Sequence, residues 1–164
     1  MPTGKKFFLI ILAIDKMFLL YVGQKDYGMT EDNLQSEPVS RLLLGKNFAH
    51  LATIMKDGSP QVTPVWVDLD DGYIIVNTAE GRLKHRNISH NPRVAISIAD
   101  HSNPYDMVTI RGKVVEQTTK GAYEHIDKMA KKYLGVDRYP NRAPGEKRII
   151  LKIKPDKVFR MNPQ

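Results

Sequence analysis

The chain has 164 residues, with 25 lysines and arginines against 18 aspartates and glutamates and a formal net charge of +7. This length suits a single domain that buries a core without metal ions or disulfides. The absence of cysteine excludes disulfides, thiol catalysis and cysteine-bound metal, and the positive charge favours an acidic ligand, nucleic acid or an anionic surface.

The N-terminal segment differs from the rest. Two apolar runs, 7–14 and 17–22, flank Asp15 and Lys16. Charges at the middle argue against a membrane-spanning helix, which needs about 20 mostly apolar residues. A signal peptide is disfavoured too, because no small-x-small cleavage site follows. Since Met29 precedes a polar, helix-starting sequence, we interpret what lies upstream as an extension of the reading frame. If it is made, it is expected to pack as an apolar helix or strand. The division is therefore an extension, 1–28, and a domain, 29–164.

The first half of the domain is predicted to be a helix followed by three strands. The helix runs from Thr30 to Gly45 and is divided at Pro38. Turn signals, Asp57-Gly58 and Asp70-Asp71-Gly72, separate apolar segments, as in consecutive hairpins. The expected strands are 48–55, 61–69 and 73–77.

The second half is predicted to hold two helices and three more strands. A basic helix begins near Gly81 and stops near Asn91-Pro92. An amphipathic helix follows at 118–134, capped by Thr119 and closed by Gly135. The other strands are 93–99, 107–116 and 148–153. Six strands joined by short turns, without a βαβ rhythm or a glycine fingerprint, predict a mainly β (α+β) antiparallel barrel rather than a Rossmann sheet.

The start of the basic helix places cations where a helix end usually attracts anions. Arg82 and Arg86 are four residues apart and repel one another. A phosphate bound by the terminal amides, Arg82 and Lys84 would offset this repulsion, and Asn87 is spaced to reach the same ligand. A solvated basic face is the alternative interpretation.

The strand at 61–69 carries two prolines, Pro60 and Pro64, which remove donors and so favour an edge position. The freed backbone, with Gln61 and Thr63, is suited to the polar edge of a planar ring; an ordinary protected edge strand is the alternative. Trp66 is placed either to stack on a ring or to fill the barrel. Thr78 and its neighbouring amides end the next strand where a phosphate held by the basic helix would lie.

Motifs for side-chain catalysis are missing. Serine, histidine and aspartate form no hydrolase signature, and the five histidines lack the spacing that places two on one metal ion. We therefore predict neither a metal site nor a side-chain catalyst. The histidines are His50, His85, His90, His101 and His125.

Several of these segments resemble the FMN-binding split-barrel superfamily, whose best-known member is pyridoxamine 5'-phosphate oxidase. The resemblance rests on His50-Leu51-Ala52-Thr53, the segment 57–66, the basic helix with Asn91-Pro92-Arg93-Val94, and Ile110-Arg111-Gly112-Lys113-Val114. It covers roughly residues 40 to 164. The nearest branch is similar to the deazaflavin-dependent oxidoreductases that use coenzyme F420.

The resemblance implies a six-stranded split barrel that forms a homodimer, with two cofactor sites at the subunit interface. Lys84 matches the phosphate-binding lysine of the superfamily. The ring strand lacks the oxidase's Arg and Lys pattern, which argues against oxidation of pyridoxamine phosphate. The implied cofactor-binding residues, with those from the preceding arguments, are Gln61, Thr63, Pro64, Val65, Trp66, Asn77, Thr78, Ala79, Arg82, Lys84, Asn87, Tyr139 and Arg142. Of these, Tyr139 and Arg142 are implied to reach the site of the partner subunit.

Our leading hypothesis is a cytoplasmic oxidoreductase that transfers a hydride between F420 and a small conjugated organic substrate. An FMN-binding oxidase or flavin carrier is the alternative. A basic barrel that binds single-stranded nucleic acid is the remote one, because aromatic residues make up only 8% of the chain and none interleave with the basic helix. We expect neither a nucleic-acid nor a membrane partner.

Overall fold

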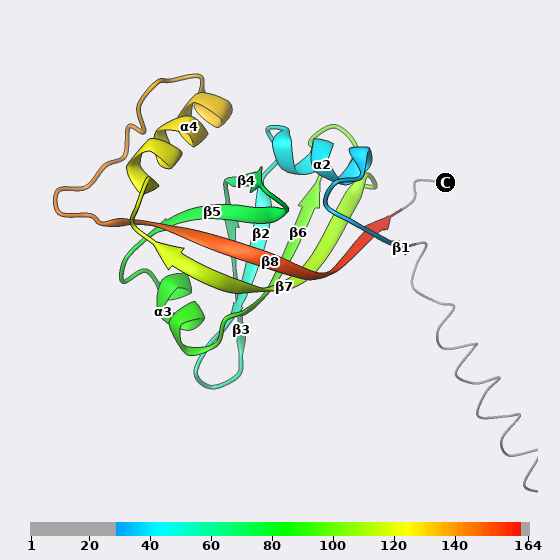
Figure 1. Cartoon of the computed structure of the whole chain (residues 1–164), viewed down its shortest axis with the longest axis horizontal. Coiled ribbons are helices and arrows are strands. Elements are labelled where there is room, and N and C mark those ends of the chain that lie inside the picture. Colours follow the sequence, from blue (N-terminus) through cyan, green and yellow to red (C-terminus); the bar gives the residue numbers. More distant parts are fainter. Residues whose placement is uncertain (1–28, 162–164) are drawn as a thin grey trace, which may run out of the picture.

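The computed structural model describes residues 29–161, so the predicted extension lies outside the described residues. The described chain forms one curled antiparallel sheet with three helices, a split barrel of the predicted class (Figure 1). The strands are β1 (Met29–Asp32), β2 (Ala49–Ile54), β3 (Pro60–Val65), β4 (Val67–Asp70), β5 (Tyr73–Ala79), β6 (Arg93–Ala99), β7 (Met107–Thr118) and β8 (Arg148–Met161), and the helices are α2 (Glu37–Leu44), α3 (Leu83–His90) and α4 (Ala122–Leu134).

The sheet has the order β3-β2-β6-β7-β8-β5-β4, and β1 adds to β8. β8 crosses the molecule and pairs with β1, β5 and β7, which joins the two halves of the barrel (Figure 1). A register shift in the β7–β8 pair lies at Arg111/Gly112. A side chain at Gly112 would collide with the Lys154 carbonyl, so glycine permits the close approach of the two strands there.

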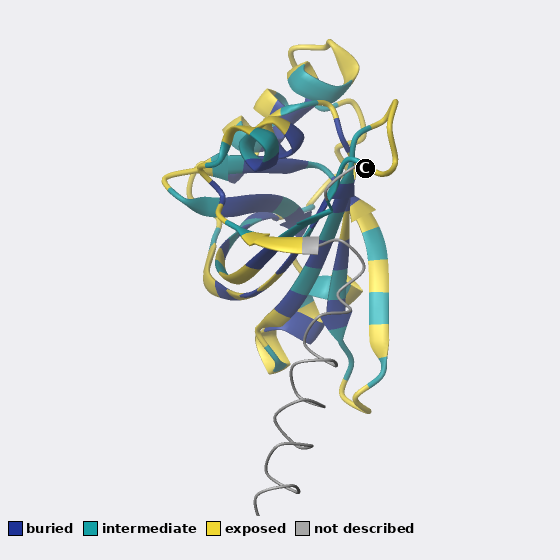
Figure 2. Cartoon of the chain, turned by 90° about the vertical axis from the view of Figure 1, so that its right-hand side faces the viewer, coloured by how far each residue is buried: buried dark blue, intermediate teal, exposed yellow. Residues whose placement is uncertain are grey.

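Alternating apolar residues fill the inside of the curled sheet. Val94, Ile96 and Ile98 of β6 are buried, while the residues between them are half-buried. Buried segments gather on the strands, and exposed segments lie mainly in loops and on helix surfaces (Figure 2). Helix α2 adds Leu42 and Leu43, both fully buried, to this core. Burial of this set supplies the main driving force for the fold.

Helix α4 is tied to the β3–β4 junction by polar contacts near its C-terminal end. The Lys132 ammonium donates to the carbonyls of Leu43 and Val67, both at 2.8 Å. The Tyr133 hydroxyl donates to the Asn47 carbonyl at 2.8 Å. Among the helices within 29–161, none is long and apolar enough to span a membrane.

The helix predicted from Thr30 is wrong in its first turn, because residues 29–32 pair with β8 as β1. The predicted strand 61–69 is broken at Trp66 into β3 and β4, so the described sheet has eight strands rather than six. Thr119 does not cap α4; the cap is Gly121, whose φ of 70° is left-handed. The last strand extends well past residue 153, because its outer half pairs with β1 and β7.

Candidate functional site

A cavity of about 290 Å³ lies where β3 ends, beside β5, α3 and α4. Eight of the predicted residues line it: Pro64, Val65, Trp66, Asn77, Thr78, Arg82, Lys84 and Tyr139. The remaining lining residues, which sequence reasoning missed, are Phe48, Ile126, Leu134, Asn141 and Arg148.

One end of the cavity is cationic and is organised by Arg148. This side chain is buried, and its Nε donates to Asn77 Oδ1 at 2.8 Å. Its Nη1 donates to Glu146 Oε1 at 2.8 Å, and Arg82 Nη2 donates to Glu146 Oε2 at 2.9 Å. Burial alone would raise the pKa of Glu146, but the hydrogen bond and charge of Arg148, together with Arg82, lower it. Glu146 therefore stays ionised and fixes both guanidinium groups.

Lys84 has no carboxylate within 4.0 Å in the described part of the chain, whereas Arg82 has Glu146. Lys84 is half-buried rather than exposed. Burial, with the charges of Arg82 and Arg148, lowers its pKa. Three cations and one carboxylate leave this end with a charge of about +2, which matches a phosphate dianion.

Thr78 supplies a further polar atom. Its hydroxyl is buried and has no hydrogen-bond partner among residues 29–161. Buried polar groups are normally paired, because an unsatisfied one costs about 1–3 kcal/mol. Thr78 is one of the residues that line the cavity, so a ligand bound there would lie beside this unpaired group. The cationic end thus fits a phosphate group by charge.

Other lining residues form an aromatic end, which adjoins the cationic one: the Arg148 guanidinium lies 5.4 Å from the centroid of the Tyr139 ring. Trp66 stacks on Tyr133 with ring centroids 5.1 Å apart and an interplanar angle of 5°. Tyr139 meets Trp66 edge-on at 5.7 Å, and Phe48 lies 5.6 Å from Tyr133. Trp66 therefore packs against a protein ring and also lines the cavity, while its stacking on a ligand ring stays a prediction.

The repulsion predicted between cations at the start of α3 is partly relieved by another residue of the protein. The predicted repulsion at Arg82 is relieved by Glu146, which lies 64 residues away in the sequence. The Gly81 amide, expected to face a phosphate, instead donates to His85 Nδ1 at 3.1 Å. Lys84 and Arg86 both lack a carboxylate within 4.0 Å in the described residues, and of these two only Lys84 lines the cavity.

Three predicted residues, Gln61, Ala79 and Asn87, do not line the cavity. Asn87 is buried, and its amide donates to Thr53 Oγ1 at 3.0 Å. Thr53 in turn donates to Gln61 Oε1 at 3.0 Å. Ala79 is buried at the end of β5. The prediction that Asn87 shares a ligand with Lys84 is not supported, because its side chain is used inside the fold.

Two further predicted residues also fall outside. The Thr63 hydroxyl is buried and unpaired within 29–161, but Thr63 does not line the cavity. Arg142 forms an ion pair with Asp127 at 2.5 Å, and its guanidinium lies 5.4 Å from the centroid of the Tyr123 ring. This pairing holds the loop before β8 against α4. Arg142 is thus placed beside the site rather than in it.

Arg148 is the most informative residue that sequence reasoning missed. It opens an apolar strand, Arg148-Ile149-Ile150-Leu151, with a side chain that is 3% exposed. A charged residue at the head of a buried strand requires partners, and that was the available signal. The partners Asn77 and Glu146 come together only in three dimensions.

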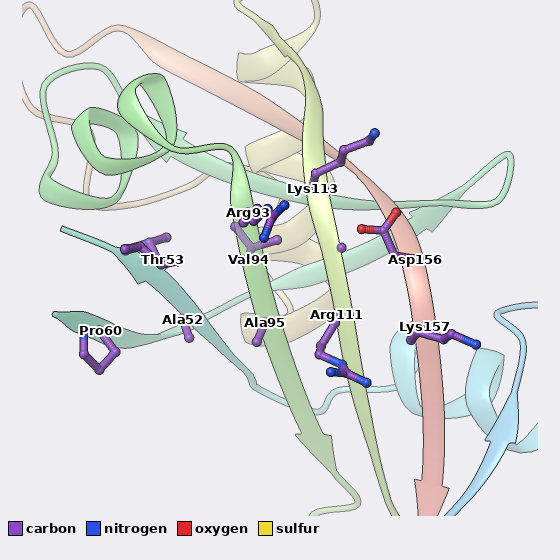
Figure 3. Close-up of a pocket in the computed structure, with 12 residues that line it drawn as sticks. Ala52, Thr53, Pro60, Arg93, Val94, Ala95, Arg111, Lys113, Asp156 and Lys157 are labelled. Carbon is purple, nitrogen blue, oxygen red and sulfur yellow. The ribbon is translucent and has the colours of Figure 1, made fainter. Parts of the chain in front are cut away.

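A second cavity, of about 680 Å³, lies on the sheet surface formed by β2, β6, β7 and β8 (Figure 3). Its cationic side chains, Arg93, Arg111, Lys113 and Lys157, are exposed. The register of β6 and β7 sets Arg93 opposite Lys113. No buried polar network supports these side chains in the described residues. Although this cavity is larger, the preorganised polar groups converge on the smaller one, and we assign the candidate site there.

Comparisons with known proteins agree with this fold. The family of pyridoxamine 5'-phosphate oxidase matches residues 36–162. A comparison with curated proteins gives no match. An F420 reductase of known structure is 30% identical over 73% of this chain and 94% of its own, with a TM-score of 0.64.

Two more distant structures share the fold. A putative pyridoxamine 5'-phosphate oxidase from Listeria innocua is 18% identical over 71% of this chain and 89% of its own, with a TM-score of 0.54. A FAD-binding protein from Mesorhizobium loti is 18% identical over 80% and 95%, with a TM-score of 0.57. Because the family match spans most of the chain, this protein belongs to the pyridoxamine 5'-phosphate oxidase family and has its flavin-binding split-barrel fold.

Proposed function

We propose that the chain is an oxidoreductase that binds the deazaflavin F420 in the 290 Å³ cavity and acts on a small conjugated organic substrate. The observation that carries the proposal is the pairing of a cationic end, with a net charge of about +2 and an unpaired Thr78 hydroxyl, with an aromatic end around Trp66. A ring that bears a phosphate needs both ends at once.

The chain's residues would divide the work of binding. Lys84, Arg82 and Arg148 would hold the phosphate, while Pro64 and Val65 at the end of β3 would lie along the ring. When bound, the cofactor supplies hydride chemistry, so no side-chain nucleophile is required. The protein's contribution is to orient the ring and exclude water, for which Trp66 and its aromatic neighbours are suited.

F420 is preferred to FMN because the 30% identical structure is named as an F420 reductase. FMN is the alternative, since it also combines a planar ring with a phosphate. Both cofactors would use the same cationic end, so they are to be distinguished at the aromatic end and by direct measurement.

We further propose that the chain works as a homodimer. Phe48 and Leu134, which line the cavity, are 54% and 51% exposed, and Val62 on the edge strand β3 is 56% exposed. A second copy would cover such apolar groups close to the site and help to enclose the ligand. Light scattering during size-exclusion chromatography should give twice the monomer mass; a monomer that binds cofactor fully would reject this part.

The main test is a titration of purified protein with F420 and with FMN, followed by absorbance and fluorescence. We expect saturable binding of F420, and reduced F420 should lose its hydride to an added conjugated acceptor only when the protein is present. Saturable binding of FMN alone would select the alternative. Binding of neither, together with salt-sensitive binding of a single-stranded oligonucleotide, would overturn the enzyme proposal.

A further inference from the structure

A line of polar groups connects the cationic end of the candidate site to a carboxylate on the far side of β5. Asp68 of β4 is buried, and its Oδ2 lies 3.7 Å from His125 Nε2. His125 Nδ1 lies 3.4 Å from Asn77 Nδ2. Asn77 Oδ1 then accepts from Arg148 Nε at 2.8 Å. His125 is therefore connected to Arg148 through a single residue, Asn77.

The orientation of the Asn77 amide is decided by its two other partners. The Arg148 guanidinium can only donate, so the atom it meets is the Asn77 oxygen. The Ala122 carbonyl can only accept, so the atom 2.7 Å from it is the Asn77 nitrogen. In this arrangement His125 Nδ1, 3.4 Å away, is the acceptor for the second hydrogen of that nitrogen. This assigns the ring proton to Nε2, which lies 3.7 Å from Asp68 Oδ2 and has no hydrogen-bond partner in the described residues.

We propose that His125 is a positioning residue for the anion-binding end of the cavity: its unprotonated Nδ1 holds the Asn77 amide, which holds Arg148, and a second proton on His125 disrupts this arrangement. The inference rests on the proposed function for the identity of the ligand. It predicts that anion affinity depends on a residue that lies outside the cavity lining.

Protonation would act through a direct conflict of donors. With both ring nitrogens protonated, an N–H of His125 would face an N–H of Asn77. If the amide rotated to accept from His125, its oxygen would face the Ala122 carbonyl and its nitrogen would face Arg148 Nε. Both of those contacts would become repulsive. Arg148 would lose the acceptor that fixes it at the cavity wall.

Protons can reach His125 from a separate cavity of about 340 Å³ that it lines. The charged groups that line this cavity come from four elements: Asp68 and Asp70 from β4, Lys128 from α4, Glu116 from β7 and Lys152 from β8. Lys128 Nζ lies 2.5 Å from Asp68 Oδ2, so the carboxylate nearest to His125 is already paired. This cavity gives a route for protons that does not pass through the cofactor site.

A purely architectural role for His125 is disfavoured, because α4 is anchored elsewhere. Lys132 and Tyr133 bind backbone carbonyls of the neighbouring elements. Met129 and Ala130 of the same helix are fully buried. Loss of the His125 ring should leave these contacts in place, so its effect should appear in ligand affinity rather than in the docking of α4.

The test compares His125→Asn with His125→Leu in the full-length protein, using FMN and F420 as probes. Asparagine places an acceptor oxygen where Nδ1 stood, whereas leucine removes it. We expect His125→Leu to weaken binding about tenfold and His125→Asn to stay within about threefold of the wild type. Equal losses in the two variants, or no loss in either, would overturn the proposal.

The pH profile and a double variant give two further readouts. As the pH is lowered and His125 gains its second proton, wild-type affinity should fall relative to that of His125→Asn, and this ratio cancels protonation of the ligand's own phosphate. Adding His125→Leu to Asn77→Ala should cause no further loss, because both act through the same amide. A constant ratio or additive losses would contradict the mechanism.

Nuclear magnetic resonance of the ligand-free protein separates failure of this inference from failure of the proposed function. As the pH is lowered, the Asn77 side-chain amide and Arg148 Nε–H signals should shift together with the His125 ring signals in the wild type but stay fixed in His125→Asn. This result would support the role of His125 even if neither probe binds. Asn77 and Arg148 signals that stay fixed while the His125 ring signals move would reject it.

Discussion

The two basic cavities of this chain differ in how their cations are held. In the smaller one, Arg148 is 3% exposed and is fixed by Asn77 and Glu146. In the larger one, Arg93 and Lys113 are exposed and face one another across β6 and β7. The larger cavity has more than twice the volume, about 680 Å³ against about 290 Å³. Size therefore does not identify the site.

The comparison teaches that preorganisation separates a binding site from a charged surface. A cation held by buried hydrogen bonds has already lost its conformational freedom before a ligand arrives. An exposed lysine must be ordered and partly desolvated on binding, and salt screens its charge. The following predictions set matched changes in the two cavities against each other.

Replacement of Arg148 by methionine should have the largest effect. It leaves Asn77 Oδ1 and Glu146 Oε1 without their buried donor. We expect a loss of about 3 kcal/mol in the free energy of unfolding, measured in urea, and cofactor affinity reduced at least about a hundredfold. The matched change Arg93→Met should alter stability by less than about 0.5 kcal/mol. Comparable losses in both variants would remove the distinction between the cavities.

Lys84→Ala should come next, with an effect confined to binding. Loss of one charge-assisted hydrogen bond to a phosphate corresponds to about 1.5–3 kcal/mol, or roughly 10- to 100-fold in affinity. The fold should persist, because Lys84 has no ion-pair partner in the described residues. Calorimetric titration measures the affinity, and Lys113→Ala is the control. Unchanged affinity in Lys84→Ala would reject its assignment as a phosphate ligand.

Asp68 should give a smaller and pH-dependent effect. Burial raises the pKa of this carboxyl, but the nearby His125 ring and the hydrogen-bonded ammonium of Lys128 outweigh it and lower the pKa below its ordinary value of 3.8. A lowered folded pKa stabilises the protein above about pH 3.8, and this contribution is lost as the pH falls through the folded pKa. Asp68→Asn should therefore cost about 1–2 kcal/mol at pH 7, since exposed Lys128 is partly screened, and the difference should shrink in acid.

Urea unfolding of the wild type and Asp68→Asn at several pH values checks this. The two stability curves should converge toward low pH. A difference that stays constant from pH 7 to the acid limit would mean that the ionised carboxylate is not the source of the stability.

The smallest effect is expected from Lys113→Gln in the larger cavity. It removes a like charge opposite Arg93, so stability should rise by a few tenths of a kcal/mol at low salt, and the gain should fade as salt is added. Thermal unfolding at two ionic strengths measures it. A clear loss of stability would show that the exposed cations are organised in a way that their exposure does not suggest.

Local sequence patterns predicted much of the fold. The alternation of Val94, Ile96 and Ile98 predicted β6 with its observed bounds, and Gly135 ended α4 as expected. The polar residues Thr30, Glu31 and Asp32 resembled a helix start, but pairing with β8 overrides that local preference. At the break between β3 and β4, Trp66 stacks on the ring of Tyr133, a contact between residues far apart in the chain that no local pattern reveals.

The residues of the candidate site also differ in whether a local sequence pattern could predict them. Arg82, Lys84 and Thr78 follow one another closely, so a local charge pattern predicted them. Arg148 and Glu146 lie more than 60 residues further on, and no local pattern joins them to α3. Asn87 shows the opposite error: its spacing from Lys84 suggested a shared ligand, whereas a contact with Thr53 in β2 uses its side chain.

The most direct test of the central claim is a crystal structure of the protein with F420 or FMN bound. The account predicts that the phosphate lies against Lys84, Arg148 and the Thr78 hydroxyl, with the ring beside β3 and Trp66. A phosphate found instead among Arg93, Arg111 and Lys113 of the larger cavity would contradict it.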